Sequence, residues 1–182
     1  MSSNSQIHQA AIIIRNGGVI SYPTESVFGL GCDPLSEPAV KRILQLKKRS
    51  ADKGLIIIAS NLQQLEPYIE ITAKEKLIIL NEKSVMTWLV RKSKLTPPWV
   101  SGKHSKIAIR ISRHPLIMAL CDEINQPIIS TSANPAGIQP AISCRQSKDY
   151  FLNQVDLYLS DSAEMSGQPT KIKDIETGAY IR

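Results

Sequence analysis

The sequence predicts an α/β fold, and three observations lead to this prediction. Apolar residues recur at helical spacing near the start of the chain, at Ile7, Ala10, Ala11 and Ile14. A strict alternation typical of a strand covers residues 107–111. Strand-like and helix-like segments then interleave with no internal repeat and no convincing linker. We therefore expect a single α/β domain over residues 1–182.

Capping and stop signals set the bounds of the expected helices. Asn16-Gly17-Gly18 ends the first helix. Ser36 can cap a second helix that runs to about Lys48, and Pro115 suits the first turn of another. Three pairs with capping-box spacing predict further helices, and these are Ser60 with Gln63, Thr72 with Glu75 and Ser143 with Gln146.

Short apolar runs bounded by turn residues predict the strands. The expected strands are residues 19–22, 55–59, 85–91, 107–111, 127–130, 157–160, 170–174 and 179–182. A turn at residues 176–178 joins the last two. In residues 107–111, the three isoleucines share one face and Arg110 lies on the other. Arg110 must then point to water or into a polar cavity, where its guanidinium could bind a carboxylate or a phosphate.

Composition narrows the class of protein. The chain has a formal net charge of +6 and a pI near 9.3, which makes a polyanion such as a nucleotide or RNA a plausible partner. With only two Phe, two Trp and five Tyr, it has little material for stacking single-stranded bases. The three cysteines are odd in number and far apart, which fits reduced thiols. With no export signal and no membrane-spanning run, we expect a cytoplasmic protein.

Three short stretches carry most of the functional information. Residues 21–31 supply hydroxyls and glycines, residues 47–54 supply cations, and residues 130–134 supply hydroxyls and an amide. Each stretch lies beside an apolar run that is expected to be a strand. Because sites in α/β proteins gather in loops at strand ends, we expect a shared pocket for an anionic ligand.

Several familiar kinds of site are absent from the sequence. It contains neither the P-loop pattern nor the G-x-G-x-x-G pattern. His8, His104 and His114 are scattered, without metal-ligand spacing or a nucleophile elbow, so we expect no metal site. An enzyme built from these residues would work by positioning and charge neutralisation, as nucleotidyl transfer can.

Each stretch also has a purely structural explanation. Thr24 can cap a tight turn that requires the neighbouring glycines. Lys47, Arg49 and Lys53 lie near a helix C-terminus, where cations favour the helix dipole and are commonly only solvated. Residues 130–134 can form a helix cap or an Asx-turn.

Taken together, the motifs resemble those of the YrdC/Sua5 family, and more narrowly its short bacterial YrdC form. They occur in the family's order from about Ile7 to Arg182, and they are Tyr22-Pro23-Thr24-Glu25, Phe28-Gly29-Leu30-Gly31, the K-x-R of Lys47 and Arg49, Asp52-Lys53-Gly54-Leu55, Ala108-Ile109-Arg110 and Ser130-Thr131-Ser132-Ala133-Asn134. The resemblance implies a twisted mixed sheet with flanking helices around a concave, positively charged cavity. It also implies an enzyme that makes L-threonylcarbamoyladenylate from L-threonine, bicarbonate and ATP for the modification of adenosine 37 in tRNAs reading ANN codons, with partner proteins completing the transfer.

The resemblance also implies roles for individual residues. Thr24, Arg110, Ser132 and Asn134 would bind threonine or its carbamate, with Arg110 on the carboxylate. The implied ATP ligands are Lys47, Arg49, Lys53, Ser130, Ser132, Thr170 and Arg182, of which Lys47 and Arg49 are catalytic together with Arg110. Mg²⁺ is expected only as a companion of the ATP phosphates.

The chain departs from the family pattern at Ser50, where the family often has proline, at Lys171, where longer members have threonine, and in one longer stretch. Where the family usually has W-P-G-P before V-T-[FW], this chain reads Glu82-Lys83-Ser84-Val85-Met86-Thr87-Trp88. An RNA-binding module of the same fold, holding tRNA or double-stranded RNA without turnover, is the alternative function. A carbamoyl-handling relative of hydrogenase maturation proteins is a third, although their companion domains and cysteine motifs are missing here.

Overall fold

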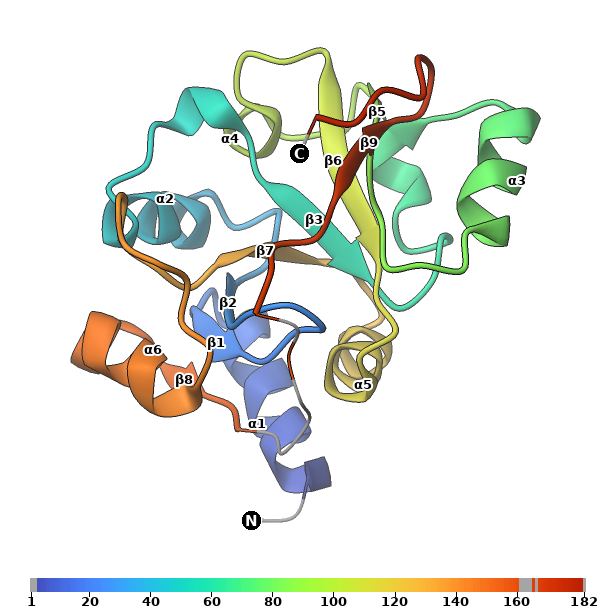
Figure 1. Cartoon of the computed structure of the whole chain (residues 1–182). Coiled ribbons are helices and arrows are strands. Elements are labelled where there is room, and N and C mark those ends of the chain that lie inside the picture. Colours follow the sequence, from blue (N-terminus) through green and yellow to red (C-terminus); the bar gives the residue numbers. More distant parts are fainter. Residues whose placement is uncertain (1–2, 161–164, 166, 182) are drawn as a thin grey trace.

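The computed structural model describes residues 3–160, 165 and 167–181. Within this part of the chain, nine strands form one mixed sheet in the order β4-β5-β6-β3-β7-β2-β1-β8, with β9 added to β5 (Figure 1). The strands are β1 (Ile20–Tyr22), β2 (Gly29–Gly31), β3 (Ile56–Ala59), β4 (Ile69–Glu70), β5 (Thr87–Lys92), β6 (Lys106–Ile111), β7 (Ile128–Ser132), β8 (Leu157–Tyr158) and β9 (Ile172–Asp174). The α/β class and the mixed sheet are therefore confirmed.

Helices flank this sheet. The α-helices are α1 (Ser3–Arg15), α2 (Glu37–Leu46), α3 (Ala73–Asn81), α4 (Pro98–Ser101), α5 (Pro115–Ile124) and α6 (Cys144–Phe151), and the 3₁₀ helices are η1 (Ala51–Lys53), η2 (Glu66–Tyr68) and η3 (Leu152–Gln154). Ser36 and Thr72 cap α2 and α3 as predicted, and Glu75 completes the capping box of α3. Ser143 caps α6, but the Gln146 side chain bonds the backbone of Ile142.

The period-two pattern of the strands produces a hydrophobic core on each face of the sheet. In β3, Ile57 belongs to the core that includes α2, whereas Ile58 belongs to the core formed with α1 and α5. The predicted helical face of Ile7 and its partners is buried in this second core. Helices α1 and α5 lie together below the sheet in Figure 1.

Two predictions about local structure are wrong. The segment after Ser60 forms turns and η2, and no α-helix. Ser60 donates its hydroxyl to Asp122 Oδ1 at 2.5 Å and its amide to Gln64 Oε1 at 3.1 Å, so Gln63 is not its partner. Gly29–Gly31, expected in a loop, forms strand β2 between β1 and β7.

The predicted strands at the end of the chain are partly confirmed. Strand β9 pairs in parallel with β5, and the turn at residues 176–178 follows it. Beyond the turn, the described residues form an isolated bridge from Tyr180 to Lys173 and no further strand. The segment 167–181, called the C-terminal segment below, runs up across the sheet in red in Figure 1.

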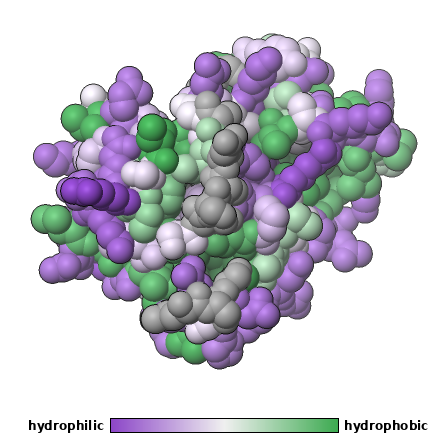
Figure 2. Space-filling view, turned by 60° about the horizontal axis from the view of Figure 1, so that its bottom comes forward, coloured by the Kyte–Doolittle hydropathy of each residue, from purple (hydrophilic) through white to green (hydrophobic). Residues whose placement is uncertain are grey.

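One face of the molecule is mainly polar (Figure 2). Hydrophilic residues cover most of the face shown in Figure 2, and apolar residues form scattered groups between them. No helix in the described ranges combines the length and the apolar character that crossing a bilayer requires.

Candidate active site

A cavity of about 460 Å³ lies on one face of the sheet. Ile56, Ala108 and Ser130 are paired across β3, β6 and β7, and all three line it. Two positions farther along, Ile58 and Ile128 pack in the core with α5. The same face of the sheet therefore carries a core at one end and the cavity at the other.

Cations and hydroxyls from distant parts of the chain converge on this cavity. Its cationic lining residues are Arg49, Lys53, Lys106 and Arg110, and its hydroxyl-bearing ones are Thr24, Ser26, Ser101, Ser105, Ser130, Thr131, Ser132 and Thr170. Among the residues that the structure describes, no Asp or Glu lines it. The arrangement favours an anionic ligand.

Arg110 is buried in the cavity wall, with 5% of its surface exposed. It lies directly opposite Thr87 in the antiparallel pair of β5 and β6, and its Nε donates to Thr87 Oγ1 at 2.9 Å. The prediction that Arg110 points away from the isoleucine core, into a polar cavity, is confirmed.

Helix α2 ends in a Schellman motif that separates the two cations of the K-x-R stretch. The amide of Arg49 donates to Leu44 O and that of Lys48 to Gln45 O. Lys48 occupies the left-handed position with φ 50°, an uncommon conformation for a residue other than glycine. The chain changes direction at Lys48, so the side chain of Lys47 points toward the end of β7 and that of Arg49 toward Gly54. The Gly54 carbonyl accepts from Arg49 Nη2 at 3.0 Å.

Lys47 lies outside the cavity lining and behind it. Its ammonium donates to the Ser132 carbonyl, to Asn134 O at 2.9 Å and to Asn134 Oδ1 at 3.1 Å. Ser132 Oγ in turn donates to Asn134 Oδ1 at 2.6 Å. Burial, and then the nearby charge of Arg49, lower the pKa of Lys47 to about 8. This lysine fixes the end of β7 and its charge remains close to the cavity.

The hydroxyl of Thr24 holds the turn that follows β1. It donates to Val27 O at 2.7 Å and accepts from the amide of Ser26 at 3.1 Å. The structural explanation for this hydroxyl is therefore confirmed, although Thr24 also lines the cavity. The next residue joins the turn to the loop between β6 and α5, because Glu25 Oε1 accepts from Ser112 Oγ at 2.6 Å and from the amide of Arg113 at 2.8 Å.

The surroundings of Glu25 lower the pKa of its carboxyl. Burial acts to raise its pKa, but the hydrogen bonds from Ser112 and from the backbone, together with the charge of Arg110, outweigh burial and lower it. The turn after β1 therefore places a carboxylate near Arg110 but outside the cavity lining.

Seven of the predicted site residues line the cavity, and these are Thr24, Arg49, Lys53, Arg110, Ser130, Ser132 and Thr170. Lys47 and Asn134 support Ser132 from behind, and Arg182 lies outside the described residues. Sequence reasoning missed Ser26, His104 and Lys106. The alternation of the strand could have revealed Lys106, because residues 106 and 108 lie on the same face as the predicted site residue Arg110.

The described ranges contain no group of three or more His, Cys, Asp or Glu side chains that could hold a metal ion. The three described cysteines are free thiols. The donor set of the cavity is thus suited to hold an anion by charge and hydrogen bonds.

Comparison with known proteins assigns the family. The model of the Sua5/YciO/YrdC family, which carries the description "Telomere recombination", matches residues 12–182. The chain belongs to the Sua5/YciO/YrdC family. The resemblance noted in the sequence is therefore confirmed.

Relatives within this family carry informative names. The chain is 41% identical over 183 residues to the threonylcarbamoyl-AMP synthase of Cellvibrio japonicus, covering 100% of this chain and 97% of that protein. It is 46% identical over 170 residues to the protein of the same name from Pseudoalteromonas atlantica, covering 91% of this chain and 90% of that protein. The crystal structure of P. abyssi Sua5 complexed with L-threonine superposes with a TM-score of 0.88 at 29% identity, covering 96% of this chain and 52% of that longer one.

Proposed function

We propose that this chain is a threonylcarbamoyl-AMP synthase, which joins L-threonine, bicarbonate and ATP and releases pyrophosphate. The observation that carries the proposal is one cavity in which four cations and several hydroxyls meet and which no described carboxylate lines. The names of the full-length relatives, and the complex of P. abyssi Sua5 with L-threonine, support it.

The proposed reaction has two steps that balance. The threonine amine takes up bicarbonate with loss of water and gives a carbamate. A carbamate oxygen then attacks the α-phosphorus of ATP, a new P–O bond forms, and the bond to the leaving pyrophosphate breaks. Two anions must approach each other in this step, so fixed cations lower the barrier. ATP enters as its Mg²⁺ complex, with the metal on phosphate oxygens and water.

Each group in the cavity has a proposed part in this reaction. Arg110 holds the threonine carboxylate through its guanidinium, whose direction Thr87 fixes. Arg49 and Lys53 neutralise the phosphates. Ser130 and Thr170 donate hydrogen bonds to the nucleotide or the carbamate, Thr24 contacts threonine, and Ser132 contacts the carbamate through its hydroxyl oxygen.

Lys47 and Asn134 act in this proposal through Ser132. They hold its carbonyl and its hydroxyl, so the Ser132 hydroxyl oxygen keeps one position at the cavity. Arg182, outside the described residues, stays a predicted nucleotide ligand. We further propose that the whole chain acts as one unit in the cytoplasm, where its thiols stay reduced, and that tRNA and transfer proteins consume the product.

Pyrophosphate release tests the proposal. The purified protein is incubated with Mg²⁺, ATP, L-threonine and bicarbonate, and threonine or bicarbonate is left out in turn as the control. Release that requires both supports the synthase. If no release occurs, and the protein instead binds RNA with an affinity that falls steeply with salt, the RNA-binding alternative is correct.

A further inference from the structure

The C-terminal segment forms one wall of the cavity. Pro169, Thr170, Ile172 and Ile181 all line it. At its lower end, the segment is fixed to the first site loop, because the Gly167 amide donates to Ser26 O at 2.8 Å and the Ser26 and Thr170 hydroxyls lie 2.8 Å apart. The upper end is fixed in a different way.

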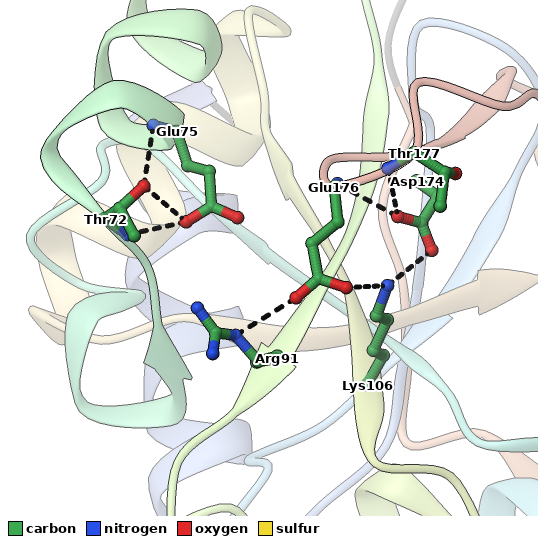
Figure 3. A network of polar contacts seen from close by, with 7 residues as sticks. All are labelled: Thr72, Glu75, Arg91, Lys106, Asp174, Glu176 and Thr177. Atoms are coloured by element: carbon green, nitrogen blue, oxygen red, sulfur yellow. Dashed lines mark hydrogen bonds and ion pairs between the residues drawn. The ribbon is translucent and has the colours of Figure 1, made fainter.

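Two cations stand directly opposite each other where the upper end meets the sheet. Arg91 and Lys106 are a register pair of β5 and β6. Like charges in such a pair repel each other unless an anion lies between them. Glu176 from the turn after β9 supplies this anion, with Oε1 at 3.1 Å from Arg91 Nε and Oε2 at 2.5 Å from Lys106 Nζ (Figure 3).

Asp174, the last residue of β9, adds a second bond to Lys106. Its Oδ2 lies 2.7 Å from Lys106 Nζ, while Oδ1 accepts from the amides of Glu176 and Thr177. The side chain of Lys106 is 19% exposed and that of Asp174 is 10% exposed, so this pair is shielded from water more than the other ion pairs among the described residues. Such a pair is screened less by salt than a surface pair.

We infer that Lys106 is a positioning residue, which acts with Glu176 and Asp174 as a clamp that holds the C-terminal segment in place as a wall of the substrate cavity. The inference rests on the proposed function for the identity of the substrate, but the clamp itself follows from the contacts. With the clamp closed, the backbone bonds of β9 place Thr170 and Ile172 against the ligand. Its loss weakens substrate binding more than it slows the chemical step.

The competing explanation is that Lys106 contacts the phosphates of ATP directly. The two explanations predict opposite results for Glu176→Gln. In a clamp, loss of the Glu176 charge releases the segment, so the KM for ATP rises about tenfold while kcat changes less than about twofold. If Lys106 instead binds the phosphates directly, removing the Glu176 carboxylate leaves the Lys106 ammonium more available to ATP, so the KM for ATP falls. A fall, or an unchanged KM, would overturn the clamp.

Two lysine variants complete the kinetic test. Lys106→Met is expected to raise the KM for ATP as much as Glu176→Gln does. The double variant is expected to raise it little further, because both substitutions break the same clamp. Lys106→Arg keeps the charge and is expected to restore most of the affinity. The matched control is Lys76→Met, which breaks an exposed pair with Glu66 outside the cavity lining and is expected to leave the kinetics unchanged.

Hydrogen exchange tests the clamp without any reaction. In Lys106→Met, the amides of residues 167–181 are expected to exchange faster than in the unaltered protein, while those of β3, β6 and β7 keep their protection. Equal exchange in both proteins would overturn the inference. If the unaltered protein shows no threonine-dependent pyrophosphate release, the proposed function fails, and the exchange result still decides on the clamp.

Discussion

Arg110 Nε donates a hydrogen bond of 2.9 Å to Thr87 Oγ1, and the two residues face each other across β5 and β6. Thr87 is fully buried, and its amide also donates to Lys171 O at 3.0 Å. One threonine thus connects the side chain of a cavity arginine with the backbone of the C-terminal segment.

The first prediction concerns this threonine. Thr87→Val keeps the shape of the side chain but removes the acceptor, so Arg110 loses its fixed direction. We expect the KM for threonine to rise about tenfold, and the free energy of unfolding to fall by about 1–3 kcal/mol because the buried donor loses its acceptor. Thr87→Ser retains the hydroxyl and serves as the control in the same pyrophosphate assay. Equal kinetics for the two variants would show that the hydrogen bond does not orient the arginine.

The second prediction concerns Arg110 itself. Arg110→Ala removes the proposed carboxylate ligand, and we expect kcat/KM for threonine to fall roughly a hundredfold, about 3 kcal/mol of transition-state stabilisation. Arg110→Lys keeps the charge but loses the paired donors of the guanidinium, so we expect a smaller fall in kcat/KM than for Arg110→Ala. Circular dichroism and thermal melting check the fold. If Arg110→Ala unfolds the protein, the residue is structural.

The third prediction uses the lowered pKa of Lys47, about 8 against 10.5 for a lysine in an unfolded chain. Between these two pH values the unfolded chain binds more protons than the folded one, so the contribution of Lys47 to the free energy of unfolding rises with pH. The rise is about 3 kcal/mol at most. Urea titrations at pH 7 and pH 10 measure this rise in the free energy of unfolding. We expect Lys47→Met to lack the rise and the control, exposed Lys74→Met, to retain it. An identical pH dependence in both variants would contradict the assignment.

The fourth prediction concerns the glycines of β2. A Cβ at Gly31 would lie 2.7 Å from Ile129 O and 2.7 Å from Tyr22 Cε1, so Gly31→Ala should destabilise the protein by about 1–3 kcal/mol. At Gly29 the nearest atom is Tyr22 Cζ at 3.3 Å, and a smaller loss is expected. Urea unfolding of both variants measures the difference. A loss at Gly29 as large as that at Gly31 would show that the gap between β1 and β7 is not what requires the glycine.

Local signals predicted those elements whose partners lie nearby in the chain. Thr72 and Glu75 form their capping box because both partners lie within one helical turn. Ser60 has the same spacing, but its hydroxyl binds Asp122, which is 62 positions away. No local pattern can reveal such a competing partner, and therefore a helix was predicted where none forms.

The same distinction applies to the candidate site. The direction of Arg110 followed from the period of one strand. The wall made by the C-terminal segment did not, because the parallel pairing of β9 with β5 joins distant residues. Strand β2 was missed because its glycines have little intrinsic preference for a strand, and its extended form depends on pairing with β1 on one side and β7 on the other.

The hydroxyl pair of Ser26 and Thr170 joins positions that are 144 residues apart. Closing so long a loop costs chain entropy, which the contacts between the two cavity walls must offset. A ligand held between both walls binds the folded protein and not the unfolded chain. Resistance to heat should therefore grow with ATP concentration in a logarithmic manner, and the nucleotide would serve the protein as a folding ligand as well as a reactant.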